Sequence, residues 1–163
     1  MPPIPPTDIQ EVMRHLPHRY PFVLVDAVAG GEGGEWVHAV KHVSVDEPFF
    51  TTVGTERPAM PPILIVEALA QAGGILCFFS GLLKPGSGST TFLAAVDRTR
   101  VERPAHAGES LDLVCRLKRA LRGVVRIEGR ASVRDVLVAE AELTIVIRDT
   151  DAEHADNDPR NAS

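Results

Sequence analysis

The chain is poor in cysteine, in aromatic residues and in basic charge, and these shortages exclude several classes of protein. Two cysteines, Cys77 and Cys115, in 163 residues cannot build a disulfide framework or a cysteine-rich metal site, which indicates a reducing compartment. The formal net charge of -5 argues against a nucleic-acid partner. The N-terminus lacks a basic start followed by an apolar run, so we expect no signal peptide and a cytoplasmic location.

The composition that remains is that of a globular protein. Hydrophobic residues make up 44% and charged residues 24% of the chain, and 163 residues suffice for one domain with a sizeable core. We expect that domain to span residues 1–148. Residues 149–163 are polar and without periodicity, so we expect a disordered tail.

The longest apolar stretch runs from Pro61 to Leu83 and contains Glu67 and Gln71. A membrane helix would place that carboxylate in hydrocarbon at a cost of several kcal/mol. We therefore predict a helix buried inside the protein, with Pro61 or Pro62 in its first turn, and no membrane partner.

The first part of the chain predicts a short amphipathic helix and two strands. Thr7 with Gln10 fits a capping box, and the apolar spacing that follows predicts a helix over Asp8–Leu16. Phe22–Val28 and Glu35–Val43 have the patterns of strands, and the glycines of residues 30–34 predict a hairpin loop between them.

The second part of the chain is dominated by alternating apolar and polar residues, which predicts an antiparallel sheet with one wet face. The expected strands are Thr91–Val101 and the alternating runs that begin near Leu111, Val125 and Leu137. Tight turns are expected at Arg122-Gly123 and Arg134-Asp135. The sequence as a whole predicts an α+β fold, in which a curved antiparallel sheet of about six strands wraps round one long helix.

Glu67 is the strongest single candidate for chemistry. A carboxylate on an apolar helix is desolvated unless it is paired, and such groups serve as general acids or bases. The alternative is a structural role, in which Glu67 caps loop amides or pairs with an arginine such as Arg57. The residues alone leave both open.

Other polar positions give weaker signals. His18 and Arg19 lie in a restrained turn between Pro17 and Pro21, either as a wall of a substrate mouth or as a packed turn. His38 and His42 share a strand face, but a metal site there lacks further ligands. The glycines at 30–34 lack the context of a dinucleotide loop. We expect no metal and no redox cofactor.

Three longer motifs resemble the FabZ-type (3R)-hydroxyacyl-acyl-carrier-protein dehydratases. The first is Leu16-Pro17-His18-Arg19-Tyr20-Pro21-Phe22, followed by Leu24-Val25-Asp26. The second joins Glu47-Pro48-Phe49-Phe50 and Pro58-Ala59-Met60-Pro61 to the helix Leu64-Ile65-Val66-Glu67-Ala68-Leu69-Ala70-Gln71. Arg103-Pro104 and Gly108-Glu109-Ser110-Leu111 resemble a later segment, so the likeness covers about residues 7 to 147.

The resemblance implies a hot-dog fold and a homodimer with joined sheets, often a trimer of dimers. It implies a tunnel for an acyl chain on a phosphopantetheine arm, carried by acyl carrier protein or coenzyme A in fatty-acid or related metabolism. In this family a histidine from one subunit removes the α-proton, an acid from the other helps the hydroxyl leave, and a glycine N–H polarises the carbonyl. By this likeness we expect the substrate to be bound by His18, Tyr20, Phe50, Met60, Ile63 and Gln71.

Only part of the family's catalytic set carries over by position. The helix acid falls on Glu67, but the histidine position is Val53 and the glycine position is Pro62. Valine cannot accept a proton, and proline has no N–H. Loss of a general base costs about 10²–10⁴-fold and loss of an oxyanion donor about 10²–10³-fold, so the lyase activity is expected to be impaired.

Three hypotheses remain open at this point. The chain is a weak hydro-lyase with a substitute base such as His18 or Glu56, a non-catalytic acyl-binding subunit that pairs with a catalytic paralogue, or a hot-dog thioesterase that uses Glu67. Binding of an acyl thioester is common to all three.

Overall fold

The computed structural model describes residues 2–50, 57–83 and 89–149 of the chain. Its main sheet has seven strands in the order β1-β2-β3-β7-β8-β9-β5, all antiparallel. Their bounds are β1 Pro3–Ile4, β2 Ala27–Glu32, β3 Trp36–His42, β7 Ser110–Leu121, β8 Val124–Val133, β9 Val136–Asp149 and β5 Ser89–Val101. A second, two-stranded sheet pairs β4 Ala59–Met60 with β6 Ala105–His106.

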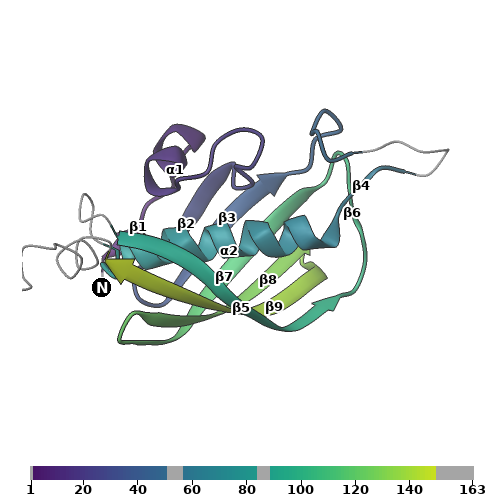
Figure 1. Ribbon diagram of the computed structural model, residues 1–163. Coiled ribbons are helices and arrows are strands. Elements are labelled where there is room, and N and C mark those ends of the chain that lie inside the picture. Colours follow the sequence, from purple (N-terminus) through teal and green to yellow (C-terminus); the bar gives the residue numbers. More distant parts are fainter. Residues whose placement is uncertain (1, 51–56, 84–88, 150–163) are drawn as a thin grey trace, which may run out of the picture.

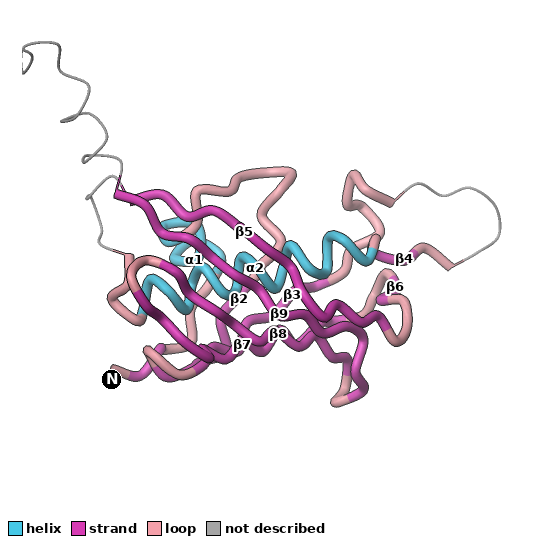
Figure 2. Tube along the Cα trace, turned by 60° about the horizontal axis from the view of Figure 1, so that its bottom comes forward, coloured by secondary structure: helices cyan, strands magenta, loops and turns pink. Residues whose placement is uncertain are grey.

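The sheet curves around a single long helix, α2, Pro62–Phe79, which lies along its inner face (Figure 1). A shorter helix, α1, Ile9–His15, lies between β1 and β2 in the chain. Figure 2 shows the long strands β7, β8, β9 and β5 running beside one another and bending together. This arrangement confirms the α+β class and the helix-in-sheet architecture predicted above.

The core forms where the inward faces of the strands meet α2. Ile65, Leu69, Ile75 and Leu76 on the helix are 0–1% exposed, and alternate residues of β7, β8 and β9 are buried against them. Gly129 on β8 permits the close approach, because a Cβ there would lie 3.3 Å from three side-chain atoms of Leu69. The burial explains why α2 is apolar nearly all round.

Helix α2 has the length and hydropathy of a membrane-spanning helix, but 56% of it is buried inside the structure. Core helices of water-soluble proteins have the same properties. The structure therefore agrees with the prediction of a buried helix for this stretch.

Several predictions for the N-terminal part are wrong in detail. The strand predicted over Phe22–Val28 begins only at Ala27, and it runs on through Gly30 and Gly31, so the turn lies at residues 33–35. Gly31 has to be glycine, because a Cβ there would lie 2.4 Å from the carbonyl oxygen of Trp36. The predicted sheet of about six strands has a seventh because Ile4, in the proline-rich start, pairs with Gly31.

The cap of α1 also differs from the prediction. Asp8, not Thr7, is the N-cap, and its side chain accepts a hydrogen bond from Glu11 N–H. Thr7 is engaged elsewhere, since its backbone pairs with Val28 and its hydroxyl donates to Pro5 O. The strand pair β4–β6 was not predicted from the sequence. Of the predicted tail, residues 150–163 lie outside the described residues, and Asp149 is the last residue of β9.

Candidate active site

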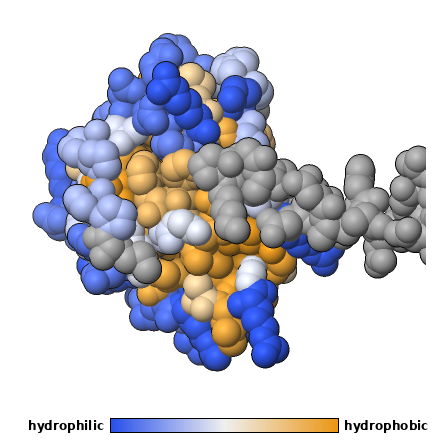
Figure 3. Space-filling model, turned by 90° about the vertical axis from the view of Figure 1, so that its left-hand side faces the viewer, coloured by the Kyte–Doolittle hydropathy of each residue, from blue (hydrophilic) through white to orange (hydrophobic). Residues whose placement is uncertain are grey.

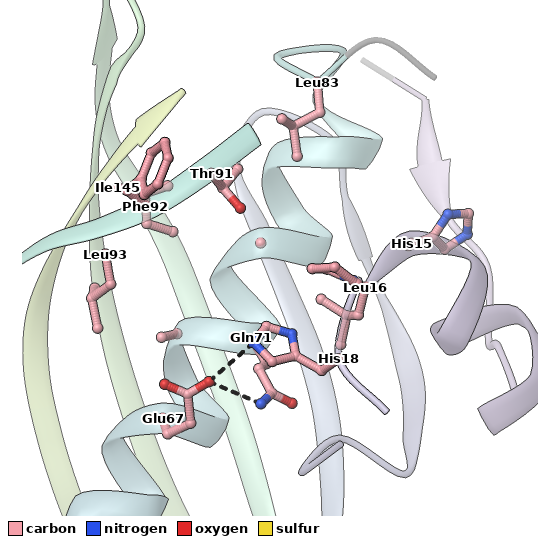
Figure 4. A pocket seen from close by; sticks show the side chains of 13 residues that line it. His15, Leu16, His18, Glu67, Gln71, Leu83, Thr91, Phe92, Leu93 and Ile145 are labelled. Carbon is pink, nitrogen blue, oxygen red and sulfur yellow. Dashed lines mark hydrogen bonds and ion pairs between the residues drawn. The ribbon is translucent and has the colours of Figure 1, made fainter. Parts of the chain in front are cut away.

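A cleft opens between α2 and the edge strand β5, with a volume of about 130 Å³ (Figure 4). We call it the α2–β5 cleft. Its walls are mainly apolar, formed by Leu16, Pro17, Ala70, Gly74, Leu83, Phe92, Leu93 and Ile145. The polar lining residues are His15, His18, Glu67, Gln71 and Thr91. The cleft therefore combines apolar walls with a polar group formed by His18, Glu67 and Gln71.

Glu67 is the centre of that polar group. Gln71 donates from Nε2 to Glu67 Oε1 at 2.9 Å, and His18 Nε2 lies 3.4 Å from the same oxygen. Figure 4 shows all three side chains converging. Glu67 and Gln71 meet because residues four apart lie on one face of a helix. The side chain of Glu67 is 24% exposed, so it remains accessible from the cleft.

Gln71 ties this group to the segment between α1 and β2. It is 2% exposed, its Oε1 accepts a hydrogen bond from Leu24 N–H at 2.8 Å, and its Nε2 also donates to Phe22 O at 2.8 Å. These bonds satisfy backbone groups that a neighbouring strand would otherwise satisfy. Gln71 thereby fixes the chain that follows His18 against α2.

His18 is held at the mouth of the cleft by the turn around it. Its Nε2 faces Glu67, whereas its Nδ1 is buried with no hydrogen-bond partner among the described residues. His18 thus lies beside Glu67 as the partner of a possible ion pair across the cleft wall.

His15 contributes to the wall of the cleft without entering the polar group. Its ring packs on Phe78 with a centroid distance of 4.1 Å and points away from Glu67 (Figure 4). Burial lowers the pKa of His15 below its ordinary value of 6.5, against an opposing effect of Glu11 and a further lowering by Arg14. His15 therefore supports the packing of α1 on the end of α2.

The structure brings together three of the residues predicted for the site, His18, Glu67 and Gln71, and separates four others from the cleft. Tyr20 is 86% exposed, Ile63 is 71% exposed, and Met60 is 1% exposed in the core. Phe50 is half-buried, with its ring 5.0 Å from that of Phe49. None of these four lines the cleft in this single chain, and their substrate contacts stay predictions.

Of the two positions at which the family's catalytic residues are replaced, the structure describes only position 62. Pro62 is the first residue of α2 and contributes no N–H there. Val53 lies outside the described residues. The alternative role of Glu67 as a partner of Arg57 finds no support among the described contacts, since Arg57 donates to Ala107 O at 3.5 Å.

The strand β5 supplies a wall of the cleft that was not predicted from the sequence. Thr91, Phe92 and Leu93 line the cleft from the edge strand, opposite Glu67 (Figure 4). Phe92 and Leu93 are 51% and 42% exposed, which is unusual for neighbouring apolar residues on a strand. The signal in the sequence was the consecutive apolar pair, which breaks the alternation of a strand with one wet face.

The histidines on the sheet have local partners. His38 Nε2 lies 2.8 Å from Asp112 Oδ1, and His42 Nδ1 lies 2.9 Å from Ser110 Oγ. In the part of the chain that the structure describes, no group of three or more His, Cys, Asp or Glu side chains could hold a metal ion.

Lys41 is a buried residue that the sequence analysis did not single out. It is 3% exposed, and its Nζ bonds to Glu47 and lies 3.3 Å from Asp26 Oδ2. Asp26 also accepts a hydrogen bond from His42 N–H at 2.6 Å. This network fixes the start of the segment that leads to Phe49 and Phe50.

Comparison with known proteins supports the fold and shows the family. The FabA-like domain family matches residues 16–142. A protein of Thiobacillus denitrificans named 3-hydroxyacyl-acyl-carrier-protein dehydratase FabZ is 44% identical over 142 residues, which are 87% of this chain and 98% of that protein. A protein of the same name from Dechloromonas aromatica is also 44% identical over 142 residues, with 87% and 99% covered.

Solved structures show the same architecture. The dehydratase heterocomplex ApeI:P from Xenorhabdus doucetiae matches with a TM-score of 0.73 at 23% identity, over 90% of this chain and 97% of that one. A hot-dog-like protein from Thermanaerovibrio acidaminovorans matches with a TM-score of 0.60 at 19% identity, over 80% and 93%. The fold is thus a hot-dog fold, and the chain belongs to the FabA-like family, among the FabZ-type 3-hydroxyacyl-acyl-carrier-protein dehydratases.

Proposed function

We propose that the chain binds acyl groups, including 3-hydroxyacyl groups, as thioesters of a phosphopantetheine arm in the α2–β5 cleft, and that on its own it is a poor dehydratase. The carrier is acyl carrier protein or coenzyme A. The observation behind the proposal is that Glu67 lies in an apolar cleft while positions 53 and 62 carry valine and proline. The chain thus keeps the cleft and the helix carboxylate of a dehydratase site, but other residues replace two of its reactive groups.

The replaced groups act on the hardest step of dehydration. Removal of the α-proton needs a base, and the negative charge that develops on the carbonyl oxygen needs a hydrogen-bond donor. Val53 cannot serve as the base, and Pro62 cannot serve as the donor. Glu67 alone would have to take a proton from carbon and deliver one to the hydroxyl.

The test is to restore both groups by the double substitution Val53→His and Pro62→Gly. Enoyl formation from a 3-hydroxyacyl thioester, followed by its ultraviolet absorbance, should rise by about 10²-fold or more over the unmodified chain. Glu67→Gln in the restored background should remove the gain. A folded double variant with no gain would show that the two replacements do not explain weak dehydration.

The proposed cleft is completed by a second chain. β5 is an edge strand of the main sheet, and Phe92, Leu93, Val96 and Val101 on it are 40–51% exposed. The end of the molecule at which β5 begins carries a broad apolar surface bordered by polar side chains (Figure 3). Pairing of two β5 strands would cover these side chains and close the cleft, as in a homodimer or a trimer of dimers.

A second candidate is a heteromer in which a paralogue supplies the missing imidazole. It is favoured by the combination of an open edge strand and a retained Glu67, because that carboxyl group would face a histidine of the partner. The neighbour from Xenorhabdus doucetiae is itself described as a heterocomplex. Co-expression with a FabZ-type protein of the same genome should yield a mixed particle whose lyase activity falls when this chain carries Glu67→Gln.

A further inference from the structure

We propose that the α2–β5 cleft hydrolyses acyl thioesters, with Glu67 Oε2 as the base that takes a proton from water and His18 as the positioning residue. The inference rests on the acyl-thioester binding proposed above and adds an activity to it. It requires neither a second subunit's histidine nor a metal.

The two carboxylate oxygens of Glu67 have different surroundings. Oε1 accepts the hydrogen bond of Gln71 Nε2 at 2.9 Å and lies 3.4 Å from His18 Nε2. For Oε2, no hydrogen bond or ion pair is recorded with any described residue. Figure 4 shows this second oxygen pointing away from His18 and Gln71. Oε2 is therefore the atom that can exchange a proton with a bound molecule.

No other side chain of the described cleft offers a comparable base. His18 cannot, because its Nδ1 is buried and its Nε2 faces Glu67. Gln71 uses its amide on Leu24, Phe22 and Glu67. His15 points away from the polar group (Figure 4), and its Nε2 lies 3.3 Å from Glu11. The geometry argues against His18 as a substitute base and leaves a single carboxylate.

A single carboxylate suits hydrolysis better than dehydration. Water is a stronger acid than the α-carbon of a thioester, and hydrolysis needs only one group that takes a proton and returns it. As the oxygen of water bonds to the carbonyl carbon, its proton moves to Glu67 Oε2. The tetrahedral intermediate then breaks its carbon–sulfur bond, and sulfur receives the proton from Glu67. The products are a carboxylic acid and the free thiol, with no other reactant.

The first turn of α2 leaves one backbone donor without a partner among the described residues, on a residue that does not itself line the α2–β5 cleft. Pro62 has no N–H, and the N–H groups of Leu64 and Ile65 bond to Pro61 O at 2.9 and 3.4 Å. The N–H of Ile63 has no recorded partner among the described residues, as expected in the first turn of a helix. Helix side chains lean toward the N-terminus, so Glu67 leans toward this turn.

The assay uses butyryl-coenzyme A, whose acyl group has no 3-hydroxyl and therefore cannot be dehydrated. Thiol release is followed with a thiol-reactive dye. Burial raises the pKa of Cys77 and of Cys115 to about 12. The protein's own thiols should therefore not react with the dye while the protein is folded. The unmodified chain should release thiol over many turnovers, and Glu67→Gln should lower kcat by about 10²-fold or more.

Two further variants test the role of His18. His18→Ala should lower kcat with little change in KM, because the carboxylate loses the side chain that lies 3.4 Å from its Oε1 and limits its movement. His18→Gln keeps a polar N–H group beside Glu67, and it should recover most of the loss. Glu35→Gln, in an exposed turn, is the matched carboxylate control and should leave kcat unchanged.

A single turnover in H₂¹⁸O distinguishes a base from a nucleophile. If Glu67 activates water, the label enters the butyrate in that first turnover. Label in the Glu67 carboxylate would instead indicate attack by the side chain itself and would overturn the role of base. Equal losses in His18→Ala and His18→Gln would overturn the positioning role.

Binding of a thioether analogue of butyryl-coenzyme A, measured by calorimetry, separates the two proposals. Binding of the analogue without thiol release from the true thioester would overturn hydrolysis and leave the proposed acyl-thioester binding intact. Absence of binding would overturn the proposed binding function itself. Binding together with thiol release that depends on Glu67 supports both.

Discussion

Gln71 is a polar residue that is almost fully buried on α2, and it uses its side-chain amide on three partners. It accepts from Leu24 N–H and donates to Phe22 O and Glu67 Oε1. A leucine in its place would keep the approximate volume and leave two backbone groups and one carboxylate oxygen without these bonds. Each buried group left unsatisfied costs about 1–3 kcal/mol.

We therefore expect Gln71→Leu to lower the free energy of unfolding by about 2–4 kcal/mol. Urea unfolding followed by circular dichroism measures this. Gln10→Leu, the same change at an exposed position of α1, is the control and should shift stability by less than about 0.5 kcal/mol. A Gln71→Leu protein as stable as the control would mean that water or a local shift satisfies Leu24 and Phe22.

His15 makes the stability of the protein depend on pH near neutrality. Burial holds the pKa of His15 below 6.5, so the unfolded chain binds a proton at a pH where the folded chain does not. The unfolding free energy should therefore fall as the pH is lowered from about 7.5 to about 5.5. Urea midpoints measured across this range should fall less steeply for His15→Gln, whereas His42→Gln at an exposed site should follow the unmodified protein.

At the scale of elements, α2 carries two adjacent glycines that have different surroundings. A Cβ at Gly73 would lie 3.0 Å from Ile127 Cδ1 and 3.4 Å from Ile145 Cδ1, which is a crowded position against the sheet. A Cβ at Gly74 would meet only Leu16 Cδ2 at 3.7 Å, which is an ordinary contact. Glycine in a helix interior is about 1 kcal/mol less favourable than alanine at either site.

Gly74→Ala should accordingly raise the free energy of unfolding by about 0.5–1 kcal/mol. Gly73→Ala gains the same helix propensity but forces two isoleucine side chains to move, so its stability should lie below that of Gly74→Ala. Thermal unfolding of the pair gives the comparison directly. A Gly73→Ala protein that matches or exceeds Gly74→Ala would show that the sheet yields easily at this contact.

The elements of the second half of the chain could be predicted because their alternation is local. The turns at Arg122-Gly123 and Arg134-Asp135 have positive φ at all four residues, as two-residue hairpin turns require. Phe22 and Leu24 were predicted in a strand for the same apolar pattern, yet their backbone groups bond to Gln71, which is more than forty residues away in the chain. A pattern of neighbouring residues cannot predict these long-range hydrogen bonds.

The site was predictable to a similar extent. Glu67 is visible in the sequence because a carboxylate interrupts an apolar helix, and His18 because two prolines restrain its turn. Their contact across 49 residues, and the walls from Phe92 and Leu93, depend on how the sheet curves and where its edge falls. The motif resemblance placed His18, Glu67 and Gln71 in one site, but it carries no information on which nitrogen of His18 faces the carboxylate.

At the scale of the whole molecule, the open edge at β5 determines whether the cleft is complete. Val96 is 40% exposed in the middle of this strand, where a second β5 would pair in the proposed dimer. A lysine there would be buried without a partner in the paired state, at a cost of several kcal/mol. In an isolated chain the same lysine would remain in water.

Val96→Lys should therefore convert the dimer to a monomer, as measured by light scattering after size-exclusion chromatography, without loss of secondary structure. Val124→Lys makes the same change at a hairpin end that is 42% exposed, and it should leave the mass of the particle unchanged. Because Phe92 and Leu93 on β5 line the cleft, the monomer should also bind the thioether analogue less tightly than the control. A Val96→Lys protein that stays dimeric would show that the subunits contact each other through another face. In that case no second β5 would cover the cleft.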